Sequence, residues 1–211
     1  MEVLVESQGY IYDISEMCKE ISWTEALNEG ASCMDISYIS DGLILQNGDA
    51  IRLTDNDQTD GIFFGAAYKV SGDSGDGGTG QIVTIKAYDQ LRRAKNKDII
   101  VLENGTLKNL VENMCTFQTM TPGTVEDPGF IIPTIADYEK WLDHIVQAVS
   151  DTLIGTQEHY CLRDEYGKVC LWNMRNLQLP LVLGDNSLCT GYSWEKSIDD
   201  DYYNQIKVVW K

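Results

Sequence analysis

Residues 81–115 constrain the fold more than any other part of the chain, because two hydrophobic patterns follow one another there. Residues 82–88 alternate between apolar and polar types, which is typical of a half-buried β-strand. A short apolar run at 99–102 predicts a second, buried strand. A helix face then follows, made of Leu107, Leu110, Val111, Met114 and Cys115, with Thr106 as its cap. The sequence therefore predicts a β-rich domain that passes directly into an α/β domain.

The first 88 residues predict a small antiparallel barrel. Short strands are expected at 3–6, 10–14, 20–25, 32–39, 50–53, 62–70 and 81–88, separated by Gly-, Asn- and Asp-rich turns. Seven short strands in fewer than 100 residues are typical of a closed or nearly closed barrel. The polar, Gly-rich residues 71–80 predict a mobile hairpin tip between the last two strands.

The second half predicts an extended connector, a second helix and a hairpin. Three of the four prolines fall within 122–133, which indicates the connector. The helix is expected over about 137–153, with a stripe of Tyr138, Trp141, Leu142, Ile145, Val146, Val149 and Leu153. The hairpin is expected over 160–172, with Tyr160, Leu162, Val169 and Leu171 on one face.

The six cysteines are scattered, with no CxxC pair, and this favours buried free thiols. A type I turn with a glycine bulge at 164–167 would place Cys161 directly opposite Cys170. A disulfide between these two cysteines is therefore the alternative to free thiols.

The charge and the hydropathy pattern restrict the function classes. The formal net charge is -17, from 16 Lys plus Arg against 33 Asp plus Glu, which argues against a nucleic-acid-binding surface. The excess of acidic residues either serves solubility or lines a passage that DNA crosses without sticking. No run approaches the roughly 20 apolar residues of a membrane span, and the first residues lack a signal-peptide pattern. We therefore expect a protein that folds in a cytoplasm and has no membrane partner.

No motif predicts catalysis, a metal or a cofactor. The segment 72–75 is similar to the neighbourhood of a serine-protease nucleophile, but both histidines, His144 and His159, follow it. The aspartates Asp55, Asp57, Asp60, Asp73 and Asp76 do not match a calcium loop. Paired carboxylates at 164–165 and 199–201 are typical of solvated turns. We therefore expect no catalytic residue, no metal ligand, no cofactor and no enzymatic activity.

Several segments together resemble one family. They are Tyr88-Asp89-Gln90-Leu91, Asn96-Lys97-Asp98, Glu103-Asn104-Gly105-Thr106-Leu107, and the stretches 160–171, 192–200 and 203–208. In their order and spacing they resemble the baseplate hub proteins of contractile phage tails, of PBSX-type defective prophages and of phage-tail-like bacteriocins.

This resemblance implies an α+β fold and a structural function. It implies a tail-tube-like antiparallel β-barrel at 1–95, a small α/β domain at 96–200, and the start of a second, truncated barrel at 201–211. It also implies a homotrimeric hub that joins the tail tube protein to the spike protein, contacts other baseplate proteins and forms part of the central channel. Such a protein would assemble in the bacterial cytoplasm and then reside in the baseplate of the released particle.

Two stretches are expected to contact partners because their backbone is predicted to be mobile or unpaired. They contribute the contact candidates Asp73, Ser74, Asp76 and Thr79 from the loop 71–80, and Gln205, Ile206, Val208 and Trp210 from the last strand. Two other function classes remain open. A tail-associated cell-wall hydrolase would need two opposed carboxylates in a cleft. A carbohydrate-binding module would need Trp23, Trp172 or Trp194 exposed along one face.

Overall fold

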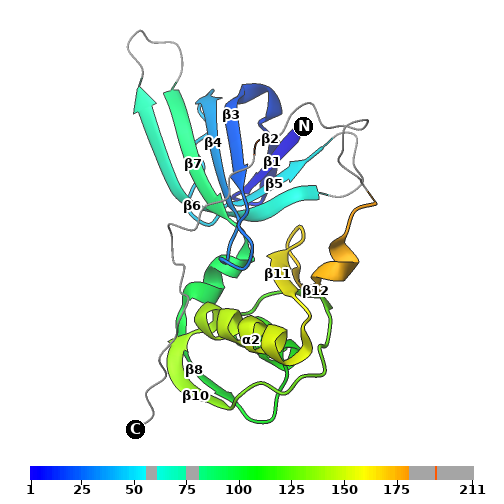
Figure 1. The fold of residues 1–211 in the computed structure, drawn as a ribbon. Helices are drawn as coiled ribbons and strands as arrows, with labels where there is room; N and C mark the ends of the chain where they lie inside the picture. Colours follow the sequence, from blue (N-terminus) through cyan, green and yellow to red (C-terminus); the bar gives the residue numbers. More distant parts are fainter. Residues whose placement is uncertain (56–60, 75–80, 181–192, 194–211) are drawn as a thin grey trace. The chain divides into compact units, whose positions relative to one another are not determined.

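The computed structural model describes residues 1–55, 61–74, 81–180 and 193. The chain divides into two compact units, Met1–Leu177 and Gln178–Lys211, and all of the elements below belong to the first (Figure 1). Two separate hydrophobic cores lie within this first unit, one built from residues 3–87 and one from residues 91–171. We call residues 2–88 the half-barrel and residues 89–177 the α/β part.

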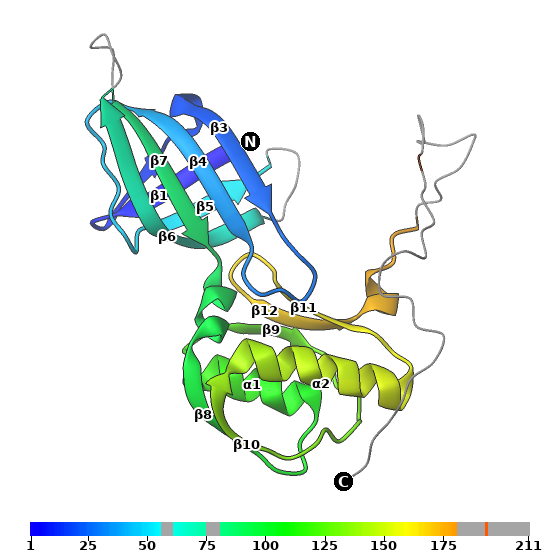
Figure 2. The same ribbon diagram turned by 60° about the vertical axis from the view of Figure 1, so that its left-hand side comes forward.

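The half-barrel is one curled antiparallel sheet of seven strands. The strands are β1 (Glu2–Ser7), β2 (Tyr10–Asp13), β3 (Cys18–Thr24), β4 (Cys33–Ser40), β5 (Ala50–Thr54), β6 (Gly61–Ser74) and β7 (Gln81–Tyr88), with a short 3-10 helix, η1 (Ser15–Met17), between β2 and β3. Their order in the sheet is β2-β1-β5-β6-β7-β4-β3 (Figure 1, with the same sheet turned in Figure 2). The predicted α+β fold with an N-terminal β domain is confirmed. The outermost strands β2 and β3 do not pair with each other, so hydrogen bonds do not close the sheet.

Strand alternation explains how a single sheet encloses a core. In β7, the side chains of Val83, Ile85 and Ala87 are buried, whereas Thr84 and Lys86 lie on the opposite face. The same alternation in β1, β4 and β5 directs the apolar side chains inward. The curl of the sheet then brings these inner faces together into one core.

The α/β part packs two helices against two small sheets. Its elements are η2 (Gln90–Lys95), β8 (Lys97–Leu102), α1 (Leu107–Phe117), β9 (Pro122–Val125), β10 (Ile135–Lys140), α2 (Trp141–Thr156), β11 (Tyr160–Asp164), β12 (Val169–Asn173) and η3 (Met174–Leu177). One sheet pairs β10 with β8, and the other has the order β11-β12-β9, with β9 parallel to β12. The predicted connector at 122–133 thus contains a strand. No helix in the described part of the chain is long and apolar enough to cross a membrane.

Helix α1 agrees closely with its prediction. It begins directly after Thr106, and its five buried residues are the five that the sequence periodicity indicated. The backbone N–H of Thr106 donates to Oδ1 of Asn109 at 2.9 Å, which satisfies a group at the helix start that has no intrahelical partner.

The predicted start of the second helix is wrong by four residues. Helix α2 begins at Trp141, and the residues before it form β10, in which Tyr138 pairs with Ile99 of β8. The side chain of Tyr138 is 62% exposed and does not belong to the buried stripe. Within the described residues β8 pairs with no strand other than β10, and this pairing holds the residues before α2 in an extended conformation. The prediction that 99–102 is buried throughout is also wrong, since only Ile100 and Leu102 face the core.

The hairpin of β11 and β12 has the predicted face but a different register. Tyr166 and Gly167 both have positive φ, 48° and 84°, which is the signature of a two-residue type I′ turn. This turn pairs Cys161 with Trp172 and Arg163 with Cys170, so the two cysteines are not opposite each other. Both are free thiols. The register differs by two residues, and a shift of two preserves the face that each side chain occupies.

Candidate assembly surfaces

The predicted contact residues lie at the limits of what the structure describes. Asp73 and Ser74 form the end of β6, where they pair with Ile82 and Gln81 of β7. Asp76 and Thr79 lie outside the described residues, and so do all four candidates from the last strand, Gln205, Ile206, Val208 and Trp210. Of the predicted contact residues, the structure therefore describes Asp73 and Ser74, which lie at the end of the long β6–β7 hairpin.

The two edges of the half-barrel expose apolar side chains, and those of β2 are not among the residues that the sequence analysis singled out. In β2, Tyr10, Ile11 and Tyr12 are all exposed, so neither face of this strand is covered. In β3, the side chain of Trp23 is 41% exposed. The sequence signal for β2 was the missing alternation, because three successive apolar residues cannot all face one core.

A groove of about 530 Å³ opens beside the edge strand β3. It is lined by Met1, Ile21, Trp23, Leu53, Gly61, Ile62 and Arg163. Most of these side chains are apolar, and Arg163 supplies the single charge. Within the described residues the groove therefore offers a hydrophobic surface next to an unpaired strand edge.

The loop between β3 and β4 contacts the α/β part at three points. Oε2 of Glu25 lies 3.4 Å from the Nη2 atom of Arg163. The side-chain amide of Asn28 donates to the carbonyl of Tyr160 at 3.2 Å and accepts from the N–H of Leu162 at 2.8 Å. Ser32 donates to Asp89 through both its N–H (2.8 Å) and its hydroxyl (2.7 Å). Polar contacts therefore join the half-barrel to the α/β part.

Asp89 is the most perturbed carboxyl group at this junction. Its side chain is almost fully buried and also accepts from the N–H of Leu91 at 2.8 Å. Burial raises the pKa of Asp89 to about 6, and the nearby carboxylate of Asp164 acts in the same direction, whereas the hydrogen bonds from Ser32 and Leu91 oppose the shift. The hydrogen bonds to Asp89 stabilise the fold, since their donors are Ser32 of the β3–β4 loop and the backbone of Leu91 in η2.

The carboxylates Asp164 and Glu165 do not form an opposed acid and base. Asp164 accepts from the Gln90 amide at 2.9 Å and from the N–H of Gly167 at 2.7 Å, and burial raises its pKa. Glu165 accepts from the indole N–H of Trp172 at 2.9 Å. Both side chains are therefore engaged in the fold and not directed at a common substrate position. The other acidic run, 199–201, lies outside the described residues.

In the part of the chain that the structure covers, the two most strongly perturbed thiols lack nucleophilic character, and the acidic side chains form no metal-binding cluster. Burial raises the pKa of Cys115 and of Cys170 to about 11 each, which keeps both as unreactive thiols. No group of three His, Cys, Asp or Glu side chains among the described residues could hold a metal ion. Of the suspected calcium ligands, Asp57, Asp60 and Asp76 lie outside the description.

The tryptophans suspected of carbohydrate binding differ in their surroundings. Trp23 lines the groove beside β3, whereas Trp172 is half-buried and donates its indole N–H to Glu165. Trp172 does not line that groove, and Trp194 lies outside the described residues. The described tryptophans thus do not make one exposed aromatic face.

The fold is that of known tail proteins. It is similar to the 43 kDa tail protein of prophage MuSo2 from Shewanella oneidensis, with a TM-score of 0.61 and 15% identity over 81% of this chain and 52% of that one. It is also similar to the prophage tail protein gp18 from Listeria monocytogenes (TM-score 0.54, 11% identity, 81% of this chain and 50% of that one) and to a tail protein from Neisseria meningitidis (0.54, 13%, 80% and 50%). The chain spans about half the length of these proteins. A comparison with curated protein sequences found no match.

The sequence itself identifies the family. The model of the YQBQ-like family matches residues 21–211, which is most of the chain and includes the half-barrel from within β3 onward and the whole α/β part. The solved structures that are similar to this chain are tail proteins, two of them from prophages, in agreement with the sequence resemblance to phage tail proteins. The chain belongs to the YQBQ-like family.

Proposed function

We propose that this protein is a structural component of a phage or phage-like tail, and that within the tail it belongs to the baseplate hub. The observation that carries the proposal is the likeness of the half-barrel and the α/β part together to prophage tail proteins, over 81% of the chain. The resemblance of the segments at 88–107 and 160–171 to baseplate hub proteins supports the more specific role in the hub.

The open half-barrel suits assembly into a ring. Its two edge strands, β2 and β3, lie at opposite ends of the sheet order, and both expose apolar side chains. An unpaired strand edge with exposed apolar side chains is a place where a neighbouring subunit can pack. In a trimeric hub with two such domains per subunit, six similar surfaces would face the hexameric tail tube, while the other end would hold the spike.

The proposed partners are further copies of the protein, the tail tube protein, the spike protein and other baseplate proteins. The net charge of -17 suits a position on the wall of a channel through which DNA passes, because like charges prevent adsorption. The protein would assemble in the host cytoplasm and remain in the baseplate of the particle. A structural role of this kind requires no catalytic residue.

The solution mass tests the hub proposal. Light scattering over a range of concentrations is applied to residues 1–211 and to a form extended past Lys211. A trimer of the extended form supports a self-assembling hub. Monomers of both forms at every concentration would overturn it, and a cell-wall fragment release assay would then test the hydrolase alternative.

A pair of variants of the extended form tests the role of the sheet edge. Ile11→Lys places a charge on the exposed strand β2, and we expect it to dissociate the trimer. Ile154→Lys makes the same change at an exposed position of α2 and should leave the trimer intact. Equal behaviour of the two variants would show that β2 is not part of the interface.

A further inference from the structure

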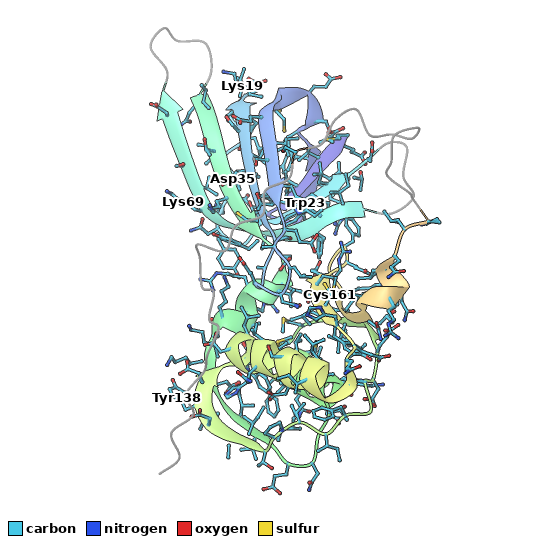
Figure 3. All side chains as sticks on the ribbon, viewed as in Figure 1. Lys19, Trp23, Asp35, Lys69, Tyr138 and Cys161 are labelled. Atoms are coloured by element: carbon cyan, nitrogen blue, oxygen red, sulfur yellow. The ribbon has the colours of Figure 1, made fainter. Side chains whose placement is uncertain are left out.

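The small sheet of β8 and β10 exposes an apolar face. Ile99 pairs with Tyr138 and Val101 pairs with Ala136, so these four side chains lie on the same face of the sheet. Ile99 is 74% exposed, Val101 61% and Tyr138 62%. Figure 3 shows Tyr138 on the side of β10 that faces away from α2. The opposite face carries Ile100 and Leu102 into the core of the α/β part.

The outer edge of β10 has no strand partner within the described residues. The N–H of Tyr138 donates to Oδ1 of Asp137 at 2.7 Å, and that of its cross-strand partner Ile99 donates to Oδ1 of Asp98 at 2.8 Å. Because both N–H groups bond to side chains, Ile99 and Tyr138 form a pair that does not exchange backbone hydrogen bonds, and such pairs alternate with hydrogen-bonded pairs along an antiparallel ladder. By alternation, the backbone groups of Ala136, Tyr138 and Lys140 point away from β8. Apart from the bonds that the N–H groups of Tyr138 and Lys140 make to the neighbouring carboxylates of Asp137 and Glu139, these groups have no backbone partner within the described residues, so another strand can be added there.

A groove runs between this edge and α2. Its volume is about 340 Å³, and it is lined by residues 132–137 on one side and by His144, Gln147, Ala148 and Asp151 on the other. The four α2 residues follow the i, i+3, i+4, i+7 spacing of one helix face. The Nε2 atom of His144 is buried and has no hydrogen-bond partner among the described residues. A polypeptide in the groove could supply that partner.

The charges on the groove indicate what kind of chain fits it. Asp137 and Asp151 line it, and in the described part of the chain neither forms an ion pair. The nearby lysines are already neutralised, because Lys97 pairs with Glu139 and Lys140 pairs with Asp143. A second copy would bring its own Asp137 and Asp151 against these carboxylates, so the charges disfavour pairing of two β10 edges. They favour a basic occupant.

We propose that the edge of β10 accepts an extended segment of another protein as a third strand. Because side chains of a strand alternate between faces, one set of residues of the added segment would continue the apolar face of Ile99, Val101 and Tyr138. The alternate set would point into the groove, where Lys or Arg side chains meet Asp137 and Asp151. The recognised partner is thus an extended peptide of alternating apolar and basic residues. This inference goes beyond the tail role and does not depend on it.

The probe is a short synthetic peptide in which Lys and Val alternate, with blocked termini and a fluorescent label. Binding is measured by anisotropy at physiological ionic strength, and the site by backbone amide chemical shifts. We expect binding below about 1 mM peptide. The amides of Ala136, Tyr138 and Lys140 should shift, and those of Asp137 and Glu139, whose N–H groups point toward β8, should shift less. The absence of binding up to about 1 mM, or shifts confined to other elements, would overturn the proposal.

Two control peptides separate strand addition from general attraction to an acidic protein. A peptide with the same Lys and Val content but with the residues in blocks keeps the charge and loses the alternation. A peptide that alternates Glu and Val keeps the pattern and reverses the charge. We expect both to bind at least about tenfold more weakly. Equal binding of the blocked and alternating peptides would contradict strand addition.

Matched protein variants localise the charge effect. Asp151→Lys reverses a charge in the groove and should weaken binding of the alternating peptide about tenfold. Glu112→Lys makes the same change in net charge on the exposed surface of α1 and should change binding less than about twofold. A similar loss in both variants would mean that bulk charge and not the groove recognises the peptide.

Discussion

Two strand edges of the α/β part differ in how their backbone groups are satisfied. The edge of β11 is covered by a side chain from a distant loop, since the Asn28 amide bonds both the carbonyl of Tyr160 and the N–H of Leu162. At the edge of β10, within the described residues, the outward N–H groups of Tyr138 and Lys140 bond to the carboxylates of the preceding residues, Asp137 and Glu139, and not to another strand. The first edge is therefore closed to an added strand, and the second is open.

The difference follows from the loop between β3 and β4. Glu25, Asn28 and Ser32 reach Arg163, β11 and Asp89, so this loop connects the half-barrel to one side of the α/β part. None of these three contacts involves β8 or β10. Stability should therefore concentrate at the β11 side and in the core, whereas the outer face of β8 and β10 should contribute little.

The largest effect is expected from the core beneath the open sheet. Ile100 is 1% exposed and its neighbour Ile99 is 74% exposed, so the same substitution samples both faces of β8. Ile100→Ala should lower the free energy of unfolding by about 2–5 kcal/mol through lost burial and a cavity. Ile99→Ala should cost less than about 1 kcal/mol. Urea titration of both variants measures the difference, and equal losses would show that the outer face is covered.

The next largest effect is a pH dependence of the free energy of unfolding, caused by Asp89, which bonds to Ser32 of the β3–β4 loop. Because the pKa of Asp89 rises from 3.8 to about 6 on folding, the folded state binds the proton more tightly than the unfolded state. The free energy of unfolding should therefore fall as pH rises from about 4 to about 6, by an amount on the order of 3 kcal/mol for a shift of about two units. Urea titrations at several pH values measure this slope.

The control for this pH dependence is Asp89→Asn, which cannot titrate. The difference between the two proteins isolates Asp89 from Asp164, whose pKa burial also raises, and from Asp13 and Glu139, whose pKa values hydrogen bonds lower. The variant should have a flatter pH profile between about 4 and 6. Parallel profiles would show that Asp89 titrates normally.

Asn28 gives a third test, because it alone closes the edge of β11 in the described residues. Asn28→Ala removes two hydrogen bonds and leaves the carbonyl of Tyr160 and the N–H of Leu162 without them. Since Asn28 also has a positive φ of 56°, the matched control is Asn104→Ala, at an exposed residue with φ 51°. The Asn28 variant should lose about 2 kcal/mol more than the control, as measured by urea titration. Equal losses would mean that only the backbone conformation matters.

Local sequence patterns predicted most helices and strands of this molecule. The errors arose where an element or a register depends on pairing between strands. The buried face of α1 and the inward face of the hairpin follow from periodicity alone, and both are as predicted. The start of α2 was wrong because Tyr138 fits a helix stripe and a strand alternation equally well, and only pairing with β8 decides between them. The register of Cys161 and Cys170 depended on the turn type at Tyr166 and Gly167.

The surfaces were less predictable than the elements. The open edge of β10 could not be inferred, because most of this strand, from about residue 137 onward, was assigned to a helix. Asn28 carries no signal of its role, since its partners in β11 are more than 130 residues away in the sequence. The exposed apolar residues of β2 had a readable signal in their missing alternation, although a sequence alone does not say which strands end a sheet.

The smallest effect on the free energy of unfolding is expected at the ion pair between Glu25 and Arg163. It measures how much charge contributes to the contact between the β3–β4 loop and β11. The side chain of Arg163 is 34% exposed and that of Glu25 is 27% exposed. Arg163 also lies 4.0 Å from Glu165, so loss of Glu25 leaves a second carboxylate nearby. Glu25→Gln should lower the free energy of unfolding by about 0.5 kcal/mol at low salt, and the difference should vanish near 1 M NaCl. Urea titrations at both salt concentrations test this. A loss as large as that of Asn28→Ala, or one that persists at high salt, would mean that the ion pair and not the amide bridge holds the loop on β11.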